Sequence, residues 1–145
     1  MRILLAIGFI LLPWVVSGNQ LEQIKPDYRG LRTGYDAKHT PKIEAPDRVK
    51  AGEWFQVKVS IGAGAEHPSM DVHHIEWIAL YKDDVEISRI YLHPVYSKPE
   101  VTFTITLDGS ATLRVLEQPN HTAPWEARKR IKVIAAEKKE GGESK

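Results

Sequence analysis

The chain has 145 residues, and its twenty lysines and arginines nearly balance its nineteen aspartates and glutamates, which gives a net charge of +1. This balance points to neither a nucleic-acid partner nor a strongly acidic one. The sequence contains no cysteine, which excludes disulfides and any thiolate acting as metal ligand, haem ligand or nucleophile. Stability must therefore come from a hydrophobic core.

The N-terminus has the pattern of a secretory signal. Met1 and Arg2 form a short charged start, residues 3–16 are almost entirely apolar, and Ser17-Gly18 offers a cleavage position. The apolar run is shorter than the ~20 residues that a membrane-spanning helix needs, although an uncleaved N-terminal anchor is the alternative. We therefore expect a signal peptide at residues 1–18, export to the periplasm or another place outside the cytoplasm, and no membrane attachment after cleavage.

The two ends of the exported chain lack a structural period. Residues 19–37 are polar and mix Pro26, Gly30 and Gly34 with charged residues, which predicts an extended N-terminal arm. Residues 136–145 are charged and contain glycine, which is typical of a disordered tail. The folded domain is therefore expected to span residues 38–135, a size that suits a single core.

The sequence predicts β-strands throughout that domain. Apolar residues alternate with polar ones at residues 55–61 and again at residues 101–107, as in half-buried strands. Short apolar runs separated by turn signals predict further strands near residues 75–81, 85–92, 111–115 and 127–134. With no convincing amphipathic helix, this predicts an all-β fold, an immunoglobulin-like antiparallel β-sandwich of about seven strands. Such sandwiches host many functions, so the fold does not decide the chemistry.

Three of the six histidines lie close together, at His67, His73 and His74. Neutral imidazole is the commonest protein metal ligand, so this density predicts part of a metal site; histidines that hydrogen-bond inside a core are the alternative. His73 and His74 enter a buried strand, so they should point to opposite faces and only one can reach a shared ion. His67 precedes Pro68, which favours extended backbone, and should lie on the loop before that strand.

The ordered motifs of the chain resemble the iron domain of superoxide reductases, which are the neelaredoxins and the catalytic half of desulfoferrodoxins. The motifs are KHTP at residues 38–41, IEAP at 43–46, VKAGE at 49–53, HP at 67–68, HHIEWI at 73–78, and residues 120–125. In that family a ferrous ion lies in a plane of four histidines, with an axial cysteine below and an open position for superoxide. The resemblance implies a mononuclear non-haem Fe²⁺ cofactor, superoxide as substrate, hydrogen peroxide as product, and an electron-donor protein as partner; it is also compatible with a homo-oligomer.

The resemblance assigns roles residue by residue. His39, His67 and His73 match the first three ligands of the plane. Lys38 matches the lysine beside the open position, where an ammonium would attract an anionic substrate and help stabilise a bound peroxide. A solvated loop lysine is the plain alternative for Lys38.

The last motif departs from the family. Where the family has Cys-Asn-x-His-Gly-x-Trp, residues 119–125 read PNHTAPW, so Pro119 replaces the cysteine and Thr122 replaces the histidine. His121 lies one position early, and we expect a shifted loop to let it complete the plane as the fourth ligand. Glu117, Asn120 or a water would then take the axial place.

Loss of the thiolate bears on the chemistry. An anionic sulfur donates electron density to iron and favours the ferric state. A site of histidines alone would hold Fe²⁺ less tightly, so copper and zinc become alternative metals. Two functions follow: an exported superoxide reductase-like iron protein, or a non-catalytic metal-binding or partner module of a periplasmic redox or sulfur-oxidising system. The missing cysteine favours the second, and the retained lysine and histidines favour the first.

Overall fold

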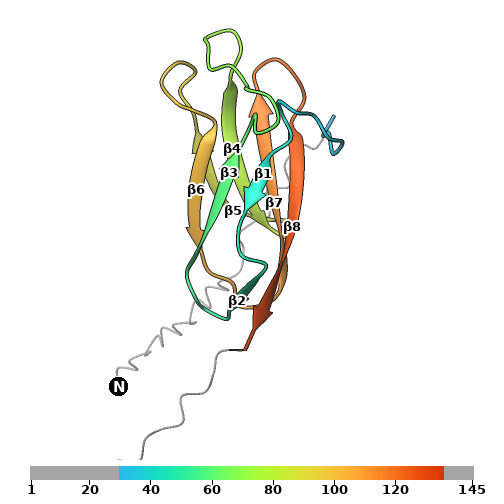
Figure 1. Cartoon of the computed structure of the whole chain (residues 1–145), viewed down its shortest axis with the longest axis vertical. Coiled ribbons are helices and arrows are strands. Elements are labelled where there is room, and N and C mark those ends of the chain that lie inside the picture. The colour runs from blue at the N-terminus through green and yellow to red at the C-terminus, as the bar shows by residue number, and fades with distance from the viewer. Residues whose placement is uncertain (1–29, 136–145) are drawn as a thin grey trace, which may run out of the picture.

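The computed structural model describes residues 30–135 as two β-sheets packed face to face (Figure 1). The expected signal peptide at residues 1–18, most of the expected arm and the expected tail at residues 136–145 lie outside this range. The eight strands are β1 (Lys42–Glu44), β2 (Arg48–Lys50), β3 (Phe55–Ser60), β4 (Ile75–Lys82), β5 (Val85–Tyr91), β6 (Glu100–Ile105), β7 (Ala111–Pro119) and β8 (Trp125–Ile134). Within the described range there is no helix of the length and apolarity that crossing a bilayer requires.

The smaller sheet has the strand order β1-β3-β6, and the larger sheet has the order β2-β8-β7-β4-β5. The all-β sandwich expected from the sequence is confirmed, with two differences in detail. There are eight strands, and β2 runs parallel to β8, so the sandwich is not wholly antiparallel. Pro46 explains the extra strand: it follows β1, offers no N–H to a sheet ladder, and comes where the chain passes from the smaller sheet to the larger one.

The core lies between the two sheets. In β3 the side chains of Phe55, Val57 and Val59 are buried, while those between them face outward, as the alternation of the sequence predicts. They belong to one hydrophobic cluster with residues of the larger sheet such as Leu80 and Val115. Burying each large apolar side chain contributes roughly 1.5–3 kcal/mol, so this core fixes the strands that carry the connecting loops.

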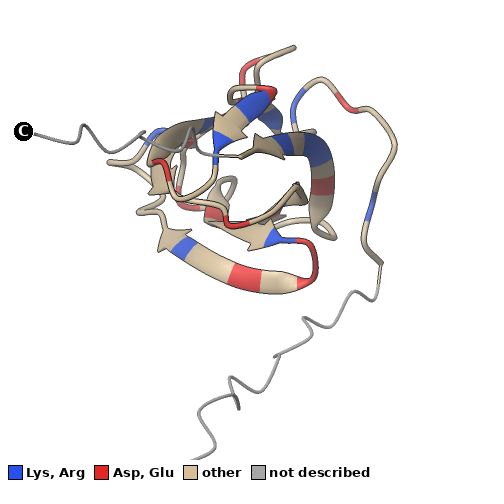
Figure 2. Ribbon diagram, turned by 90° about the horizontal axis from the view of Figure 1, so that it is seen from below, with Lys and Arg blue, Asp and Glu red and all other residues tan. Residues whose placement is uncertain are grey.

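The outer face of the larger sheet is also partly buried. Tyr81 and Leu116 form a second cluster there, with Leu31 packed against it. Beside this cluster, Arg114 forms a buried ion pair with Glu126 at 2.8 Å. Seen from below, the sandwich carries charged residues of both signs on its strands and loops (Figure 2), in keeping with the near-zero net charge.

Candidate metal centre

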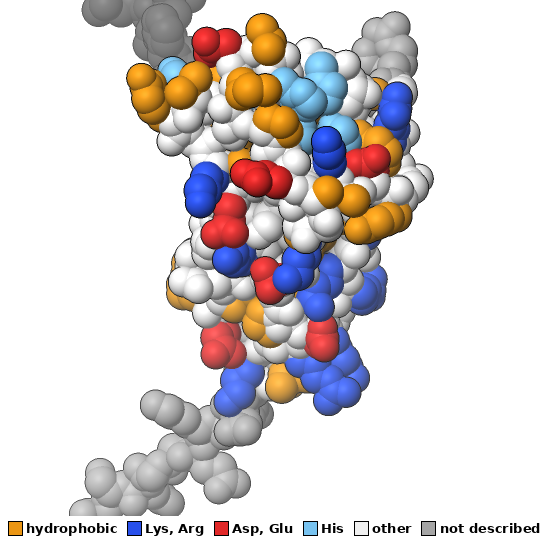
Figure 3. All heavy atoms as spheres, turned by 45° about the horizontal axis from the view of Figure 1, so that its top comes forward, with side chains coloured by type: hydrophobic (Ala, Val, Ile, Leu, Met, Phe, Trp, Pro, Cys, Tyr) orange, Lys and Arg blue, Asp and Glu red, His pale blue; other side chains and the backbone are white. Residues whose placement is uncertain are grey.

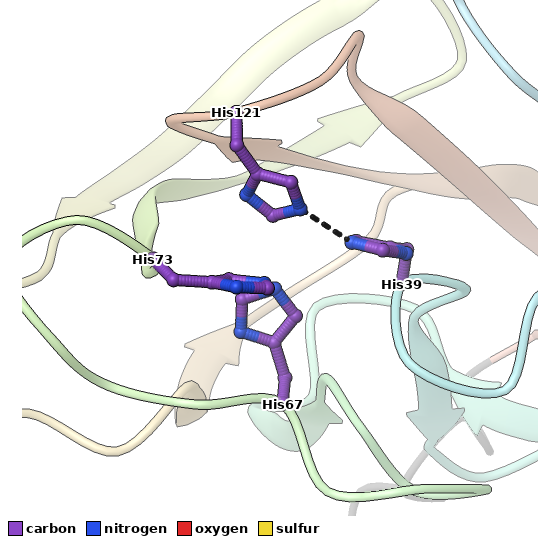
Figure 4. Close-up of side chains that lie close together, drawn as sticks. All are labelled: His39, His67, His73 and His121. Carbon is purple, nitrogen blue, oxygen red and sulfur yellow. Dashed lines mark hydrogen bonds between the residues drawn. The ribbon is translucent and has the colours of Figure 1, made fainter.

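Four histidines from three separate segments meet at one end of the sandwich (Figure 4). His39 precedes β1, His67 and His73 lie between β3 and β4, and His121 lies between β7 and β8. Figure 3 shows histidine side chains gathered at the surface of this end, with hydrophobic side chains beside them. The structure therefore brings together the four residues that the sequence analysis expected to share an ion.

The spacing of the ring nitrogens suits one metal ion. Each histidine offers one nitrogen, and these four atoms lie within 4.8 Å of one another. The Nε2 atoms of His39 and His121 are 3.2 Å apart. Bonds of about 2.1 Å to a central ion place neighbouring ligand nitrogens of a square about 3 Å apart and opposite ones about 4.2 Å apart. An ion therefore fits among them after a contraction of a few tenths of an ångström.

Hydrogen bonds on the far side of two rings determine which nitrogen faces the cluster. His39 donates from Nδ1 to the carboxylate of Asp36 at 2.9 Å, and His67 donates from Nδ1 to the carbonyl of Pro68 at 2.8 Å. Each ring in its neutral form then has its lone pair on Nε2. The buried Nε2 atoms of His67 and His73 have no hydrogen-bond partner. A metal ion would satisfy these orphaned nitrogens, so the donor set fits the iron that the family implies.

The electrostatics favour the neutral form of two of the four rings, His67 and His121. The pKa of His67 is lowered to about 4: burial is the largest cause, the neighbouring imidazoles act in the same direction, and the hydrogen bond to Pro68 acts in the opposite direction. The pKa of His121 is also lowered, by burial and then by His73 and His39. Neutral imidazole is the form that binds metals, so both rings are ready to bind near pH 7.

Asp36 is a residue of this site that sequence reasoning missed. Its carboxylate accepts hydrogen bonds from the backbone N–H groups of Lys38 and His39 as well as from the His39 ring. These bonds hold the pKa of Asp36 below its ordinary value, with the His39 ring as the largest cause. An aspartate two or three residues before such N–H groups is the signal of an Asx-type turn, and it could have been found in the sequence.

The loops are joined to one another by backbone contacts. The carbonyl of Ala37 accepts hydrogen bonds from the N–H groups of Gly64 and Ala65, which ties the His39 loop to the His67 loop. Gly64 makes this approach feasible, since a Cβ there would lie 3.1 Å from both the Cα and the Cβ of Ala37. Gly62 lets the His67 loop fold back on itself: its φ is +80°, and a Cβ there would lie 2.6 Å from the backbone nitrogen of His67. Only glycine adopts such a conformation readily and leaves that space free.

The His121 loop is joined to the site by Trp125 and Asn120. The indole of Trp125 stacks on the His39 ring, with centroids 5.5 Å apart and planes 10° apart. The side-chain oxygen of Asn120 accepts a hydrogen bond from the backbone of His74 at 3.0 Å. His74 itself hydrogen-bonds through Nδ1 to the carbonyl of Met70, so of the adjacent pair only His73 belongs to the cluster.

Lys38 and His93 are not members of the histidine cluster. Lys38 is exposed and directly precedes His39. Exposure within the cluster increases from His67, which is buried, to His121, which is exposed, so the site opens to solvent on the His121 side. His93 lies on the loop between β5 and β6, where its Nδ1 accepts hydrogen bonds from the backbone of Val95 and Tyr96.

Fold and site together define a class of protein: a β-sandwich with a histidine metal site built from the loops at one end. The desulfoferrodoxin family model matches residues 32–128, so the chain belongs to the desulfoferrodoxin family. A relative from Methanocaldococcus jannaschii, named as a candidate superoxide reductase, is 39% identical over 103 residues, or 68% of this chain and 86% of the relative. Neelaredoxin of Megalodesulfovibrio gigas is 30% identical over 112 residues, or 65% of this chain and 86% of that protein.

Solved structures agree with this assignment. The superoxide reductase (neelaredoxin) from Ignicoccus hospitalis is 45% identical, with a TM-score of 0.61 over 66% of this chain and 81% of that one. A candidate superoxide reductase from Thermotoga maritima is 31% identical, with a TM-score of 0.68 over 73% of this chain and 96% of that one. The similarity therefore extends over most of the length of these structures.

Proposed function

We propose that this chain is an exported, superoxide reductase-like protein that binds one non-haem Fe²⁺ and reduces superoxide by one electron to hydrogen peroxide. The four histidines would hold the ion: His39, His67, His73 and His121. The observation that carries the proposal is their convergence, with two buried nitrogens unpartnered and one side of the cluster open to solvent. The names of its relatives, superoxide reductase and neelaredoxin, support the same chemistry.

Iron, when bound, would supply the single electron that, together with two protons, converts superoxide to hydrogen peroxide. The histidines hold the ion, and the hydrogen bond from His39 to Asp36 orients one of these rings. Lys38 would place an ammonium near the open side, where it attracts the superoxide anion. An external electron-donor protein would then restore the ferrous state.

Export is part of this proposal. A charged start followed by the apolar run at residues 3–16 supports a cleaved signal peptide and a periplasmic or other extracytoplasmic location. The absence of cysteine from the whole chain is compatible with an oxidising compartment, because there is no thiol to oxidise.

The direct test is rapid mixing of superoxide with protein shown to be fully loaded with Fe²⁺. We expect stoichiometric oxidation of the iron. Lys38→Ala should slow this step, and most strongly at low ionic strength, where electrostatic attraction is least screened. The matched control is Lys42→Ala, which removes a nearby exposed lysine that is paired with Glu44 at 3.1 Å.

One observation favours a second function. With no cysteine, the site has no thiolate to favour the ferric state, and histidines alone also suit copper or zinc. The chain would then be a non-catalytic metal-binding or partner module of a periplasmic redox or sulfur-oxidising system. Protein that is fully loaded with Fe²⁺ and is not oxidised by superoxide would contradict the enzyme and support this module.

A further inference from the structure

Glu117 is a buried carboxyl group on the inner side of the sandwich, near the end of β7. Its neighbours across the sheet are Ile78 in β4 and Trp125 in β8. Ile78 belongs to the core between the sheets, as does Val115 two residues before Glu117. Side chains directly opposite one another in a sheet share a face, so the side chain of Glu117 points into the sandwich, where it is 0% exposed.

Neither carboxyl oxygen of Glu117 has a hydrogen-bond partner. Within residues 30–135 there are five such buried side-chain atoms, and the other three are Nε2 of His67, Nε2 of His73 and Nε1 of Trp125. Trp125 stacks on His39, so all five orphaned atoms belong to the histidine end of the molecule. Buried polar groups are rarely left unpaired, and a metal ion is a partner that suits both unpaired imidazole nitrogens and an unpaired carboxylate at the same end of the molecule.

Glu126 is the other buried glutamate, and unlike Glu117 it is paired with cations. Glu126 lies on the next strand with its side chain on the outer face, where Arg114 pairs with it at 2.8 Å and Arg128 also bonds to it. Burial acts to raise its pKa, but these bonds hold the pKa below the ordinary value. Glu117 has no such cation among the described residues that could neutralise its charge.

The charge environment of Glu117 suits the binding of a cation nearby. Burial is the largest cause that raises the pKa of Glu117 to about 9, and the negative charge of Asp36 is the second. The geometric link is Trp125, which lies opposite Glu117 in the sheet and stacks on His39. The carboxylate is not among the four ligand atoms that lie within 4.8 Å of one another, so binding requires the Glu117 side chain to turn toward them. A divalent ion held by the histidines would reverse the effect and stabilise the carboxylate.

We propose that Glu117 supplies the anionic inner ligand of the metal, bound from the interior of the sandwich. This inference rests on the histidine metal site of the proposed function. Of the other axial candidates, Asn120 is committed to the backbone of His74. A carboxylate would give the site the negative donor that Pro119 cannot provide, and it would favour iron over softer metals and the ferric over the ferrous state.

The test uses Co²⁺ as a spectroscopic probe in the full chain, without superoxide, so that it is independent of catalysis. Glu117→Gln keeps the size of the side chain and removes its charge. We expect Co²⁺ affinity to fall by about tenfold or more and the d–d absorption of the saturated protein to change. Glu126→Gln, which alters a carboxylate that is equally buried but lies on the outer face, should leave both properties unchanged.

A second variant guards against a general folding defect. Glu117→Leu removes an unpaired buried carboxyl group, so the metal-free protein should melt several degrees higher while its Co²⁺ affinity falls. A purely structural role for Glu117 predicts the reverse, a lower melting temperature with unchanged affinity. The proposal is overturned if both variants bind Co²⁺ with the wild-type affinity, or if the saturated spectrum is unchanged in both.

Discussion

At the scale of single residues, burial controls the charge of the site. His67 is only 4% exposed, and desolvation holds its pKa near 4. The pKa of His121 is lowered too, first by desolvation and then by the neighbouring imidazoles, which disfavour its charged form. These two rings therefore accept a metal ion without first releasing protons near pH 7.

The metal-free protein should lose stability as the pH falls from about 6.5 to about 4. In this window the unfolded chain protonates His67 near pH 6.5, whereas the folded chain keeps it neutral down to a pKa of about 4. The unfolded state therefore binds more protons, and the free energy of unfolding should fall by about 3 kcal/mol. Urea unfolding at a series of pH values measures this loss. In His67→Gln most of it should disappear, and a variant with the full wild-type slope would contradict the assignment.

The fourth ligand is tested by comparing two histidines. His121→Ala should weaken Fe²⁺ or Co²⁺ binding by about tenfold or more, because it removes one of four converging nitrogens. His93→Ala should leave binding unchanged, since that ring is engaged in its own turn. Metal titration of the purified variants measures both, and the opposite order would place the site elsewhere.

At the scale of elements, the loops carry the site and the strands hold the loops. The carbonyl of Ala37 bridges two of the loops through Gly64 and Ala65, and the Trp125 ring connects the third loop to His39. The geometry of the cluster therefore depends on backbone contacts between segments that are far apart in sequence.

Gly62→Ala should disturb both stability and metal binding. The position combines a φ of +80° with a distance of only 2.6 Å from an added Cβ to the His67 backbone nitrogen. We expect a loss of about 1–3 kcal/mol in the free energy of unfolding and weaker metal binding, because the His67 loop must move. Gly109→Ala is the control, since a Cβ there meets nothing within 4 Å. Equal effects of the two substitutions on metal affinity would show that the close approach at Gly62 does not position His67.

At the scale of the whole molecule, the four histidines lie outside the principal hydrophobic core. The principal hydrophobic cluster lies between the sheets, and the histidines lie on loops at one end. The chain contains no cysteine and therefore has no thiolate ligand to offer a metal. The electronic properties of a bound metal must therefore come from nitrogen and oxygen donors.

This has a spectroscopic consequence. When the iron-loaded protein is oxidised, its absorption in the red should be nearly featureless, because no sulfur anion is present to produce a sulfur-to-iron charge-transfer band. Visible spectroscopy before and after a mild chemical oxidant measures this. A strong red band in the oxidised protein would contradict a nitrogen and oxygen donor set.

The sequence alone determined the all-β class, because apolar residues such as Val57 and Phe103 alternate with polar ones wherever one face of a strand is buried. It also predicted the four clustered histidines: His39, His67 and His73 from motifs that match the family, and His121 from the expectation of a shifted loop. It did not predict the parallel pairing of β2 with β8, since strand partners depend on contacts between distant segments.

Only the tertiary structure decided what meets at the site. His121 lies beside His39 although 82 residues separate them, and the direction of a loop side chain follows from backbone contacts that no local period encodes. The same holds for Asp36, which turns toward the His39 ring, and for Glu117, whose lack of a partner becomes visible only when all its neighbours are in place. Residue types are local information, whereas convergence on one point is a property of the folded chain.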